Sequence, residues 1–414
     1  MLKVLRYSFL CMLLVTLALF VIYTFFPGVI DTAAGFWESN TNSSFFDTSG
    51  AFSCGSQWAK RYKAFHAKSL KSRDRKFMVY YCSGRDTGCG GYGNRLLGLV
   101  SVFYLSVLMN RTFLIHWGGP ENFQDYFRPN QINWIYDKTR IAGLSARSTY
   151  FGVNSVPDYD RYSALKMKDF HNWVQKTRME HYFDRPVEKI GVIWYFANIL
   201  RNNPHLNKLA RDAGIPEPRD EFPYGMLGCA MQFLFKKSLA LQREYSKAYE
   251  AFGSRPRPIL GIHIRTSDHH FGSFNDFSYR TRNPRRVFAC ARQVEAIIKR
   301  KGLVTQKQAV TWFLAADDVK LKRQALKDYP DHVITLDIEP RHLEYSNSAD
   351  AVFMDLLVDF LLLLECDYFI GTRMSTYSSA VLGTRQFSTQ SFVYGEPCEL
   401  NQNALELSSP PHKT

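Results

Sequence analysis

The carboxyl-terminal half of the chain has the most regular hydrophobic pattern. Short apolar runs, rich in β-branched and aromatic residues, alternate with longer amphipathic or apolar stretches. The short runs predict strands and the longer stretches predict helices. Strands are expected from 258 and at 310–316, 332–336 and 368–371, and helices at 284–301, 319–327, 349–365 and 375–382. Such alternation predicts a doubly wound α/β domain whose sheet is covered on both faces.

The stretch 258–268 opens this half and carries its most informative residues. It begins as an apolar run and ends in polar residues, as expected of a buried parallel strand whose carboxyl end opens into a ligand crevice. Because side chains alternate along a strand, His263 and Arg265 should share one face. The Arg265 guanidinium could clamp two phosphate oxygens, or it could form a surface ion pair.

Polar clusters follow two further strands of the same predicted sheet. Asp317 and Asp318 follow one strand, and an acid there commonly receives a ribose hydroxyl or a base edge. Asp318 could equally cap the next helix, so we expect one acid to cap and the other to bind. The other cluster opens the last helix, where hydroxyls and free amides could hold a diphosphate or simply cap it. It contains Thr372, Arg373, Ser375 and Thr376.

The amino-terminal half begins with a predicted βαβ unit. A β-prone run at 76–82 is followed by a glycine-rich loop at 88–95, an apolar helix at 96–109 and a strand at 112–117. A glycine loop that opens a helix can bind an anion. This loop ends in Gly93, Asn94 and Arg95 rather than the Gly-Lys-Ser/Thr of NTPases, and a tight packing turn explains it equally well.

The rest of this half is less regular. It contains a polar and aromatic stretch at 117–189, an apolar run at 190–196, a predicted helix at 226–252 and a hinge at 253–258. Asp158 and Asp160 have the Asp-x-Asp form of some metal sites, but Pro157 and the lack of a leading strand favour a solvated turn. The adjacent His269 and His270 lack further ligands at suitable spacing, which favours a polar loop over a metal site.

The amino terminus predicts a membrane anchor. Residues 7–26 carry no charge and match the roughly 20 residues of a spanning helix. Lys3 and Arg6 precede them, so the positive-inside rule keeps the tail 1–6 cytosolic and gives a single-pass type II topology. The alternative is a cleaved signal peptide, whose apolar region is usually shorter. Residues 27–75 are then expected to form a stem.

Composition narrows the range of partners. A chain of 414 residues with a formal charge of +14 should hold two domains and attract nucleic acid, anionic membrane or a phosphorylated small molecule. Zinc-finger spacing and basic tails are missing from the sequence, which disfavours nucleic acid. Aromatic residues make up 15% of the chain, which suits ring stacking on sugars or bases.

Cysteines and glycosylation motifs agree with a secretory address. Eight cysteines are present, and Cys11 lies in the predicted span. The seven others would face an oxidising compartment, so at least one stays free or pairs between chains. Cys82 and Cys89 are near enough in sequence to close a small loop. Asn42 and Asn110 start glycosylation motifs, although the end of an apolar helix could hide Asn110.

These motifs resemble a superfamily of GDP-fucose-dependent fucosyltransferases. Residues 89–101 are most similar to plant xyloglucan fucosyltransferases and, more distantly, to nodulation fucosyltransferases. His263, Arg265 and Asp268 resemble a His-x-Arg-x-x-Asp motif shared with α1,6- and protein O-fucosyltransferases, and 313–318 and 367–376 resemble two further motifs. Thr266 replaces a frequent second basic residue, so Arg95 or Arg373 would have to help neutralise phosphate.

The resemblance implies a GT-B-like architecture of two Rossmann-like domains with a cleft between them. The amino-terminal domain (76–252) would take the acceptor, the carboxyl-terminal domain (256–400) would take GDP-fucose, and a tail (401–414) would follow. It implies no metal or other cofactor, a Golgi membrane location, a glycan or glycoconjugate acceptor, and an α1,2 linkage in preference to others. A homodimer is left open.

The implied reaction is an inverting transfer of L-fucose to a hydroxyl. Arg265, Ser375 and Thr376 would meet the charge that grows on the leaving diphosphate. Asp268 or Asp276 would act as the base, or would merely hold the loop. The implied donor-binding residues are Gly93, Asn94, Arg95, His263, Arg265, Asp317, Asp318, Thr372, Arg373, Ser375 and Thr376.

Two other functions remain as alternatives. A membrane-tethered lectin or inactive homologue would keep the fold and lose the transfer. A type II sulfotransferase would need a lysine in its phosphosulfate-binding loop, and the loop that ends at Arg95 has none.

Overall fold

The computed structural model describes residues 54, 56–82, 89–119, 122–152, 159–164, 166–215, 224–266, 281, 283–336, 349–385, 391–394 and 398. All of them belong to one compact unit, Gly50–Thr414, which is distinct from Met1–Ser49. The predicted anchor and most of the predicted stem therefore lie outside the described residues. Among the helices that are described, none combines the length and the apolar character that a membrane crossing requires.

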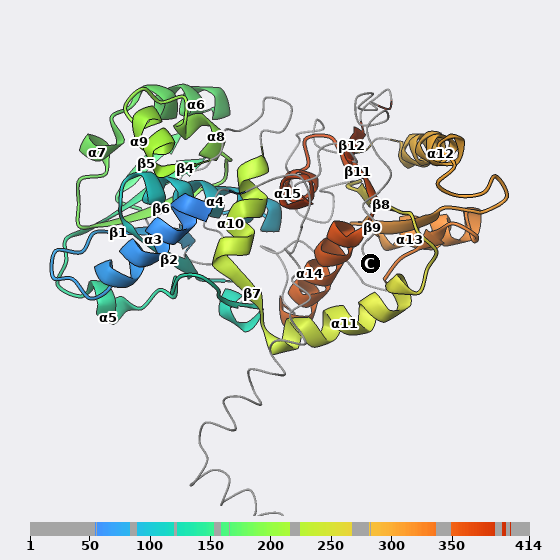
Figure 1. Cartoon of the computed structure of the whole chain (residues 1–414), viewed down its shortest axis with the longest axis horizontal. Helices are drawn as coiled ribbons and strands as arrows, with labels where there is room; N and C mark the ends of the chain where they lie inside the picture. Colours follow the sequence, from blue (N-terminus) through green and yellow to red (C-terminus); the bar gives the residue numbers. More distant parts are fainter. Residues whose placement is uncertain are drawn as a thin grey trace, which may run out of the picture. The chain divides into compact units, whose positions relative to one another are not determined.

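The described chain is built on two parallel sheets (Figure 1). The first sheet has the strand order β2-β1-β6-β4-β5, and every neighbouring pair is parallel. Its strands are β1 (Phe77–Cys82), β2 (Thr112–Trp117), β4 (Ala146–Gly152), β5 (Arg161–Ala164) and β6 (Val187–Val192). The predicted βαβ unit is confirmed, because α4 (Tyr92–Leu108) connects β1 to its neighbour β2.

The second sheet has the strand order β10-β9-β8-β11-β12, again with parallel pairs. In chain order this is 3-2-1-4-5, the arrangement of a dinucleotide-binding domain. The predicted doubly wound domain is thus confirmed. Its strands are β8 (Ile259–Ile264), β9 (Thr311–Ala316), β10 (Val333–Ile334), β11 (Tyr368–Thr372) and β12 (Ser391–Tyr394), the last of which the sequence did not predict.

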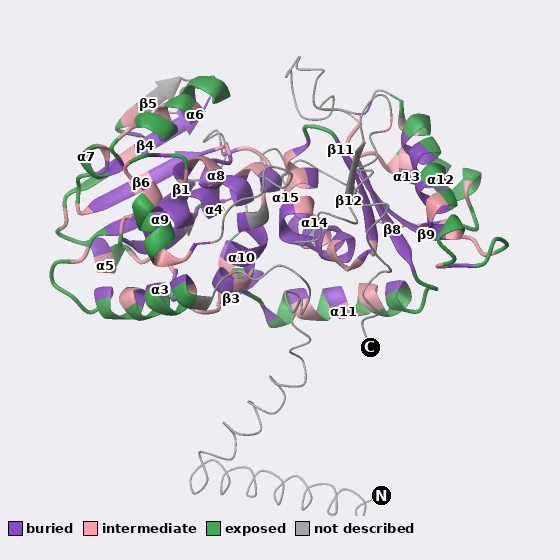
Figure 2. Cartoon of the chain, turned by 45° about the horizontal axis from the view of Figure 1, so that its top comes forward, coloured by how far each residue is buried: buried purple, intermediate pink, exposed green. Residues whose placement is uncertain are grey.

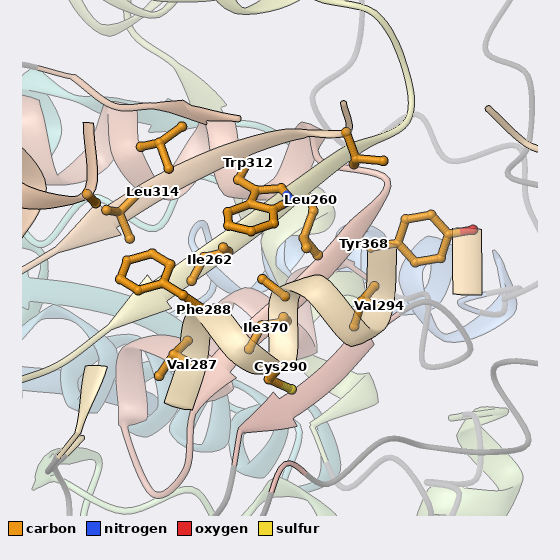
Figure 3. Packing of buried hydrophobic residues seen from close by; sticks show 14 of the residues in the cluster. Leu260, Ile262, Val287, Phe288, Cys290, Val294, Trp312, Leu314, Tyr368 and Ile370 are labelled. Carbon is orange, nitrogen blue, oxygen red and sulfur yellow. The ribbon is translucent and has the colours of Figure 1, made fainter. Parts of the chain in front are cut away.

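Helices pack on both faces of the second sheet. On one face, α12 (Pro284–Arg300) buries Val287, Phe288 and Val294 against Ile262 and Trp312 (Figure 3). The other face carries α14 (Ala349–Glu365) and α15 (Thr376–Arg385), and α13 (Val319–Asp328) follows β9. Figure 2 shows β8, β9 and β11 buried and the outer surfaces of α11 (Leu239–Gly253) and α12 exposed.

The remaining described elements belong to the amino-terminal half. The longer helices are α3 (Ser56–Ser69), α6 (Met167–Lys176), α9 (Asn207–Ala213) and α10 (Gly225–Leu234). The short elements are η1 (Phe123–Asp125), β3 (Phe127–Pro129), α5 (Lys138–Ile141), α7 (Met179–Tyr182), α8 (Ala197–Leu200) and β7 (Phe235–Lys237).

Two predictions in this half are wrong in detail, those for the helix at 226–252 and for the stem. The single helix expected at 226–252 is two helices, because Phe235–Lys237 leaves the helix to pair antiparallel with β3, and Ser238 then caps α11 by accepting from Leu241 N. The apolar run at 190–196 contributes its first residues to β6, which ends at Val192. Part of the expected stem is α3, which buries Trp58 and Tyr62 against Phe103 and Phe233.

The cysteines pair as an oxidising compartment would allow. The small loop between Cys82 and Cys89 is closed by a disulfide, as the spacing suggested. Cys366 is buried and free, which accounts for the odd number. Asn110 is exposed and has a left-handed φ of 49°, so the fold does not hide it. The other described disulfides are Cys54–Cys229 and Cys290–Cys398.

The predicted hinge at 253–258 is held by specific contacts. α11 ends at Gly253, and the Arg257–Pro258 bond is cis. The Arg257 guanidinium lies 2.7 Å from an Asp367 carboxylate oxygen and donates to the Glu365 carbonyl at 3.0 Å. The segment that enters β8 is therefore tied to the end of α14 and the start of β11.

Candidate functional site

The candidate site lies where the strand order of the second sheet changes direction, between β8 and β11. Ligands of open α/β sheets bind outside the carboxyl ends of the strands at this point. Arg265 and Thr266 leave β8 there, and Thr372 ends β11. The Arg265 backbone N–H donates to Thr372 Oγ1 at 3.0 Å, and the Thr266 N–H donates to Asp317 Oδ1 at 2.8 Å. The three predicted clusters thus meet at one edge.

Thr372 joins the two central strands at this edge. Its side chain is buried, and its hydroxyl donates to the His263 carbonyl at 3.0 Å. The same oxygen accepts from Arg265 N and lies 3.2 Å from the Thr281 hydroxyl. Thr372 is therefore bonded to the backbone on both sides of Ile264, at His263 and at Arg265. These bonds fix the backbone that carries the Arg265 side chain at the end of β8.

His263 is a buried and neutral member of the site. Its Nδ1 lies 2.7 Å from Ser378 Oγ, and its ring lies 4.7 Å from that of Tyr377. Burial, with the nearby charges of Arg265 and Lys322, lowers the pKa of His263 to about 3. As the alternation predicted, His263 lies on the α15 face of the sheet, whereas Ile262 and Ile264 pack in the α12 core.

The two adjacent acids have different roles in the structure. Asp318 caps α13, because its carboxylate accepts from Lys320 N at 2.7 Å and Leu321 N at 3.3 Å. Asp317 accepts from both the backbone and the hydroxyl of Thr266, at 2.8 and 2.9 Å. The capping role that the sequence allowed for one acid is confirmed for Asp318, which leaves Asp317 as the acid at the strand edge.

The turn from β11 to α15 carries the remaining cluster. Ser375 is buried, its N–H donates to the Thr372 carbonyl at 3.2 Å, and Thr376 begins α15. Arg373 is exposed. Met374 has a left-handed φ of 63° and is 51% exposed, which is unusual for a bulky residue. The turn therefore presents one basic and one apolar side chain beside the helix start.

The glycine-rich loop meets this turn. A Cβ at Gly93 would lie 2.4 Å from the Thr376 carbonyl carbon and 2.5 Å from Tyr377 N, so only glycine lets α4 approach the start of α15. The half-buried Asn94 follows at this contact. The residues of the first predicted motif and those of the last are therefore neighbours in space.

The Arg95 side chain points into the interior and bonds to backbone carbonyls, whereas the resemblance implied that it helps to bind phosphate. Its side chain is fully buried, Nε donates to the Gly90 carbonyl at 2.8 Å, and Nη1 donates to the Gly119 carbonyl. The guanidinium also lies 5.1 Å from the Trp117 ring centre. These contacts brace the loop from inside, so Arg95 shapes the turn that Gly93 and Asn94 follow.

A buried ion pair beside the site was missed by the sequence analysis. Lys322 Nζ lies 3.7 Å from Asp359 Oδ2, and both side chains are buried. Burial, opposed by Lys322, raises the pKa of Asp359 to about 6. Asp359 Oδ1 has no hydrogen-bond partner within the described part of the chain. A charge inside the apolar run 349–365 was the signal that could have revealed this residue.

The two candidate bases are not placed. Asp268 and Asp276 lie outside the described residues, as do His269 and His270. Asp158 of the Asp-x-Asp turn lies there too, while Asp160 accepts from Ser148 N at 2.7 Å. The described residues contain no group of three or more side chains suited to hold a metal ion.

This chain is similar to known proteins in its structure, but no match to its sequence was found. No protein-family model and no curated protein matches the sequence. The chain is similar to a variant of Arabidopsis thaliana FUT1 in complex with GDP, with a TM-score of 0.55 and 15% identity over 87% of this chain and 83% of that one. This likeness supports the α/β fold of two parallel sheets described above.

Two further structures show weaker similarity. The fucosyltransferase NodZ from Bradyrhizobium is 17% identical over 74% of this chain and 92% of its own, with a TM-score of 0.44. POFUT1 in complex with GDP is 14% identical over 78% of this chain and 99% of its own, also with a TM-score of 0.44.

Proposed function

We propose that this protein is a fucosyltransferase that moves L-fucose from GDP-fucose to a hydroxyl of a glycan or glycoconjugate. The observation that carries the proposal is the meeting of Arg265, Thr372, Ser375 and Asp317 at the strand-order reversal of a nucleotide-binding sheet. The fold is shared with the FUT1 structure, which contains GDP.

The diphosphate of the donor would lie between β8 and the start of α15. Arg265 would offer a bidentate fork, and Ser375 and Thr376 would offer hydroxyls beside the first turn of the ten-residue helix α15, where Ser378 N donates to Ser375 Oγ at 3.5 Å. His263 is neutral and adds no competing charge. Asp317 would receive a ribose hydroxyl, and the free Asp359 Oδ1 is an acceptor of the kind that the N–H groups of guanine require.

The transfer itself would proceed by direct displacement with inversion. The acceptor oxygen forms a bond to fucose C1 while the bond from C1 to the β-phosphate oxygen breaks, and GDP leaves with the electron pair. Arg265, Ser375 and Thr376 would be fixed donors toward that developing charge, which favours the transition state over the bound substrate. The hydroxyl proton would pass to Asp268 or Asp276. This scheme uses no metal, and we favour an α1,2 linkage.

The cellular setting is part of the proposal. The uncharged stretch 7–26, preceded by Lys3 and Arg6, would anchor the protein in the Golgi membrane with residues 50–414 in the lumen. The described disulfides fit that compartment, because they persist where thiols are oxidised.

The central test is the Arg265→Ala variant of residues 50–414. With GDP-fucose and a chelator present, we expect release of GDP by the wild type and a loss of about 100-fold or more in the variant. Arg255→Ala, at an exposed position of the linker, is the matched control and should keep the wild-type rate. Circular dichroism would verify that both variants are folded.

Two outcomes would contradict the proposal in different ways. A folded Arg265→Ala variant with full activity would refute the phosphate clamp. A wild-type protein that neither binds nor turns over GDP-fucose would refute the enzyme and leave the lectin-like alternative. With activity in hand, transfer to a glycan array would identify the acceptor and linkage.

A further inference from the structure

A row of aromatic rings crosses the carboxyl end of the first sheet. Tyr81 of β1 pairs with His116 of β2, and a bridge between Ile115 and Ile135 sets Tyr136 beside His116. Paired residues of parallel strands share a face. The three rings therefore lie on one face, with centres 4.6 Å apart for Tyr81 and His116 and 4.8 Å apart for His116 and Tyr136.

The row continues inward over Gly191. The Tyr159 ring lies 5.8 Å from Tyr81 and 5.2 Å from Tyr150, and its hydroxyl donates to the Tyr81 carbonyl at 2.8 Å. A Cβ at Gly191 would lie 2.4 Å from the Tyr159 hydroxyl, so glycine makes room for that ring. Tyr159 and Tyr150 are buried and act as a rigid base for the partly exposed rings of Tyr81, His116 and Tyr136.

The two faces of the first sheet are covered by different helices. α4 packs on the opposite face, where Phe103 contacts Phe113 and Tyr92 contacts Trp117. On the face of the ring row, the four-residue α5 packs lower on the strands, where its Ile141 joins the cluster of Phe77 and Val79. The rings at the strand ends thus remain partly open to solvent.

Positive charge accompanies the rings. Lys189 Nζ lies 5.2 Å from the Tyr81 ring centre. The charges of Lys189 and Lys138 both act on His116, whose pKa is lowered to about 4, first of all by burial. The nearby acids are engaged with backbone groups, Asp137 with Thr139 N at 2.8 Å and Asp160 with Ser148 N at 2.7 Å.

We propose that the surface formed by Tyr81, His116, Tyr136, Lys138 and Lys189 binds a sugar ring that carries a carboxylate, as in a uronic acid of an acidic glycan. Tyr81 and His116 are stacked on each other, so the partly exposed Tyr136 ring at the end of the row offers the apolar contact that the C–H face of a pyranose requires, and the neutral imidazole and the phenols offer hydrogen bonds to its hydroxyls. The two ammonium groups provide the charge for the carboxylate. As an acceptor subsite, this surface rests on the proposed function.

Binding can be tested without the donor. Residues 50–414 would be titrated calorimetrically with tetragalacturonate and, separately, with a neutral galactose tetrasaccharide. We expect the acidic ligand to bind more tightly, and Lys189→Gln and Tyr136→Ala each to weaken it about tenfold. Lys68→Gln, which removes an exposed charge on α3, is the matched control. Tyr136→Phe, which keeps the ring, should retain most of the affinity.

Each outcome decides one part of the proposal. Equal binding of the neutral tetrasaccharide would overturn the carboxylate recognition. No binding of either ligand, or unchanged binding in folded Lys189→Gln and Tyr136→Ala proteins, would overturn the surface itself. Arg265→Ala should bind tetragalacturonate as the wild type does, and the surface variants should hydrolyse GDP-fucose normally. A failure of the donor site is therefore distinguished from a failure of this surface.

Discussion

At the scale of single residues, the candidate site depends on a hydroxyl that the sequence did not single out. Ser378 Oγ accepts from Thr372 N at 2.9 Å and lies 2.7 Å from His263 Nδ1. Ser378 is buried, so no solvent can replace these bonds. One small side chain thereby fixes both the imidazole and the end of β11.

We expect Ser378→Ala to lower the free energy of unfolding by about 1–3 kcal/mol, because it leaves a buried imidazole nitrogen and a buried N–H unsatisfied. It should also weaken GDP binding, since the strand ends lose their fixed spacing. Urea unfolding and GDP titration measure the two effects. Ser254→Ala removes an exposed hydroxyl that bonds to Ala251 O and should change stability by less than about 0.5 kcal/mol. Equal effects of the two substitutions would contradict this role.

Residue-level predictability had a clear limit. Alternation along β8 was sufficient to separate His263 from Ile262 and Ile264, because it depends only on local geometry. The inward course of Arg95 was not predictable, since it follows from the distant carbonyl of Gly119. The pairing of Lys322 with Asp359 likewise joins two helices that the sequence shows only one at a time.

At the scale of elements, the contact between α4 and α15 places the glycine-rich loop against the β11–α15 turn. It requires a glycine at position 93, where any side chain would meet backbone atoms of Thr376 and Tyr377. Backbone cannot yield as the tip of a side chain can. The start of α15 is therefore positioned from outside its own domain.

Gly93→Ala should cost about 1–3 kcal/mol of unfolding free energy through overpacking and should displace the helix start that would face the proposed donor. We expect a raised KM for GDP-fucose, measured by steady-state release of GDP. Gly253→Ala, at the exposed end of α11, is the control. A Cβ there would lie 3.1 Å from the Tyr249 ring, and a side chain can shift where the backbone beside Gly93 cannot. A Gly93→Ala protein with wild-type stability and KM would show that the close approach of α4 to α15 does not affect function.

Elements were predictable where the pattern was local. The carboxyl-terminal half followed its strict alternation almost throughout, and the predicted helix at 349–365 matches α14. The break at Phe235–Lys237 was not predictable, because its cause is pairing with Phe127–Pro129, more than one hundred residues away. The packing of α3 was hidden for the same reason, since its partners Phe103 and Phe233 are remote in sequence.

At the scale of the whole molecule, two buried histidines and the half-buried His116 should make the free energy of unfolding depend on pH in the acid range. The pKa of His66 is lowered to about 4, that of His116 to about 4 and that of His263 to about 3, in each case mainly by burial. Below about pH 6.5 the unfolded chain takes up these protons and the folded chain does not. The contribution of these neutral histidines to the free energy of unfolding is therefore complete above about pH 6.5 and is lost as the pH falls toward 4. The pKa of Asp359 is raised to about 6, so this group instead makes the folded state more stable as the pH falls below about 6.

His66→Gln isolates one of these protons. His66 Nε2 lies 3.0 Å from the Phe113 carbonyl, and a glutamine amide can donate there without titrating. Between pH 7 and pH 4.5, the variant should lose about 2 kcal/mol less unfolding free energy than the wild type. Urea unfolding at a series of pH values measures this difference. Parallel stability curves for the two proteins would show that His66 titrates normally in the folded state.

The disulfide between Cys54 and Cys229 determines how the folded unit would bear a mechanical load. It joins the first described residue to α10, 175 positions further along the chain. A pull on the chain before Cys54 is carried across this covalent link directly into the interior of the domain. The force therefore does not act first on α3, the helix that follows Cys54. A tether attached at the amino terminus would load the Cys54–Cys229 disulfide before it could pull α3 off the domain and expose Trp58 and Tyr62.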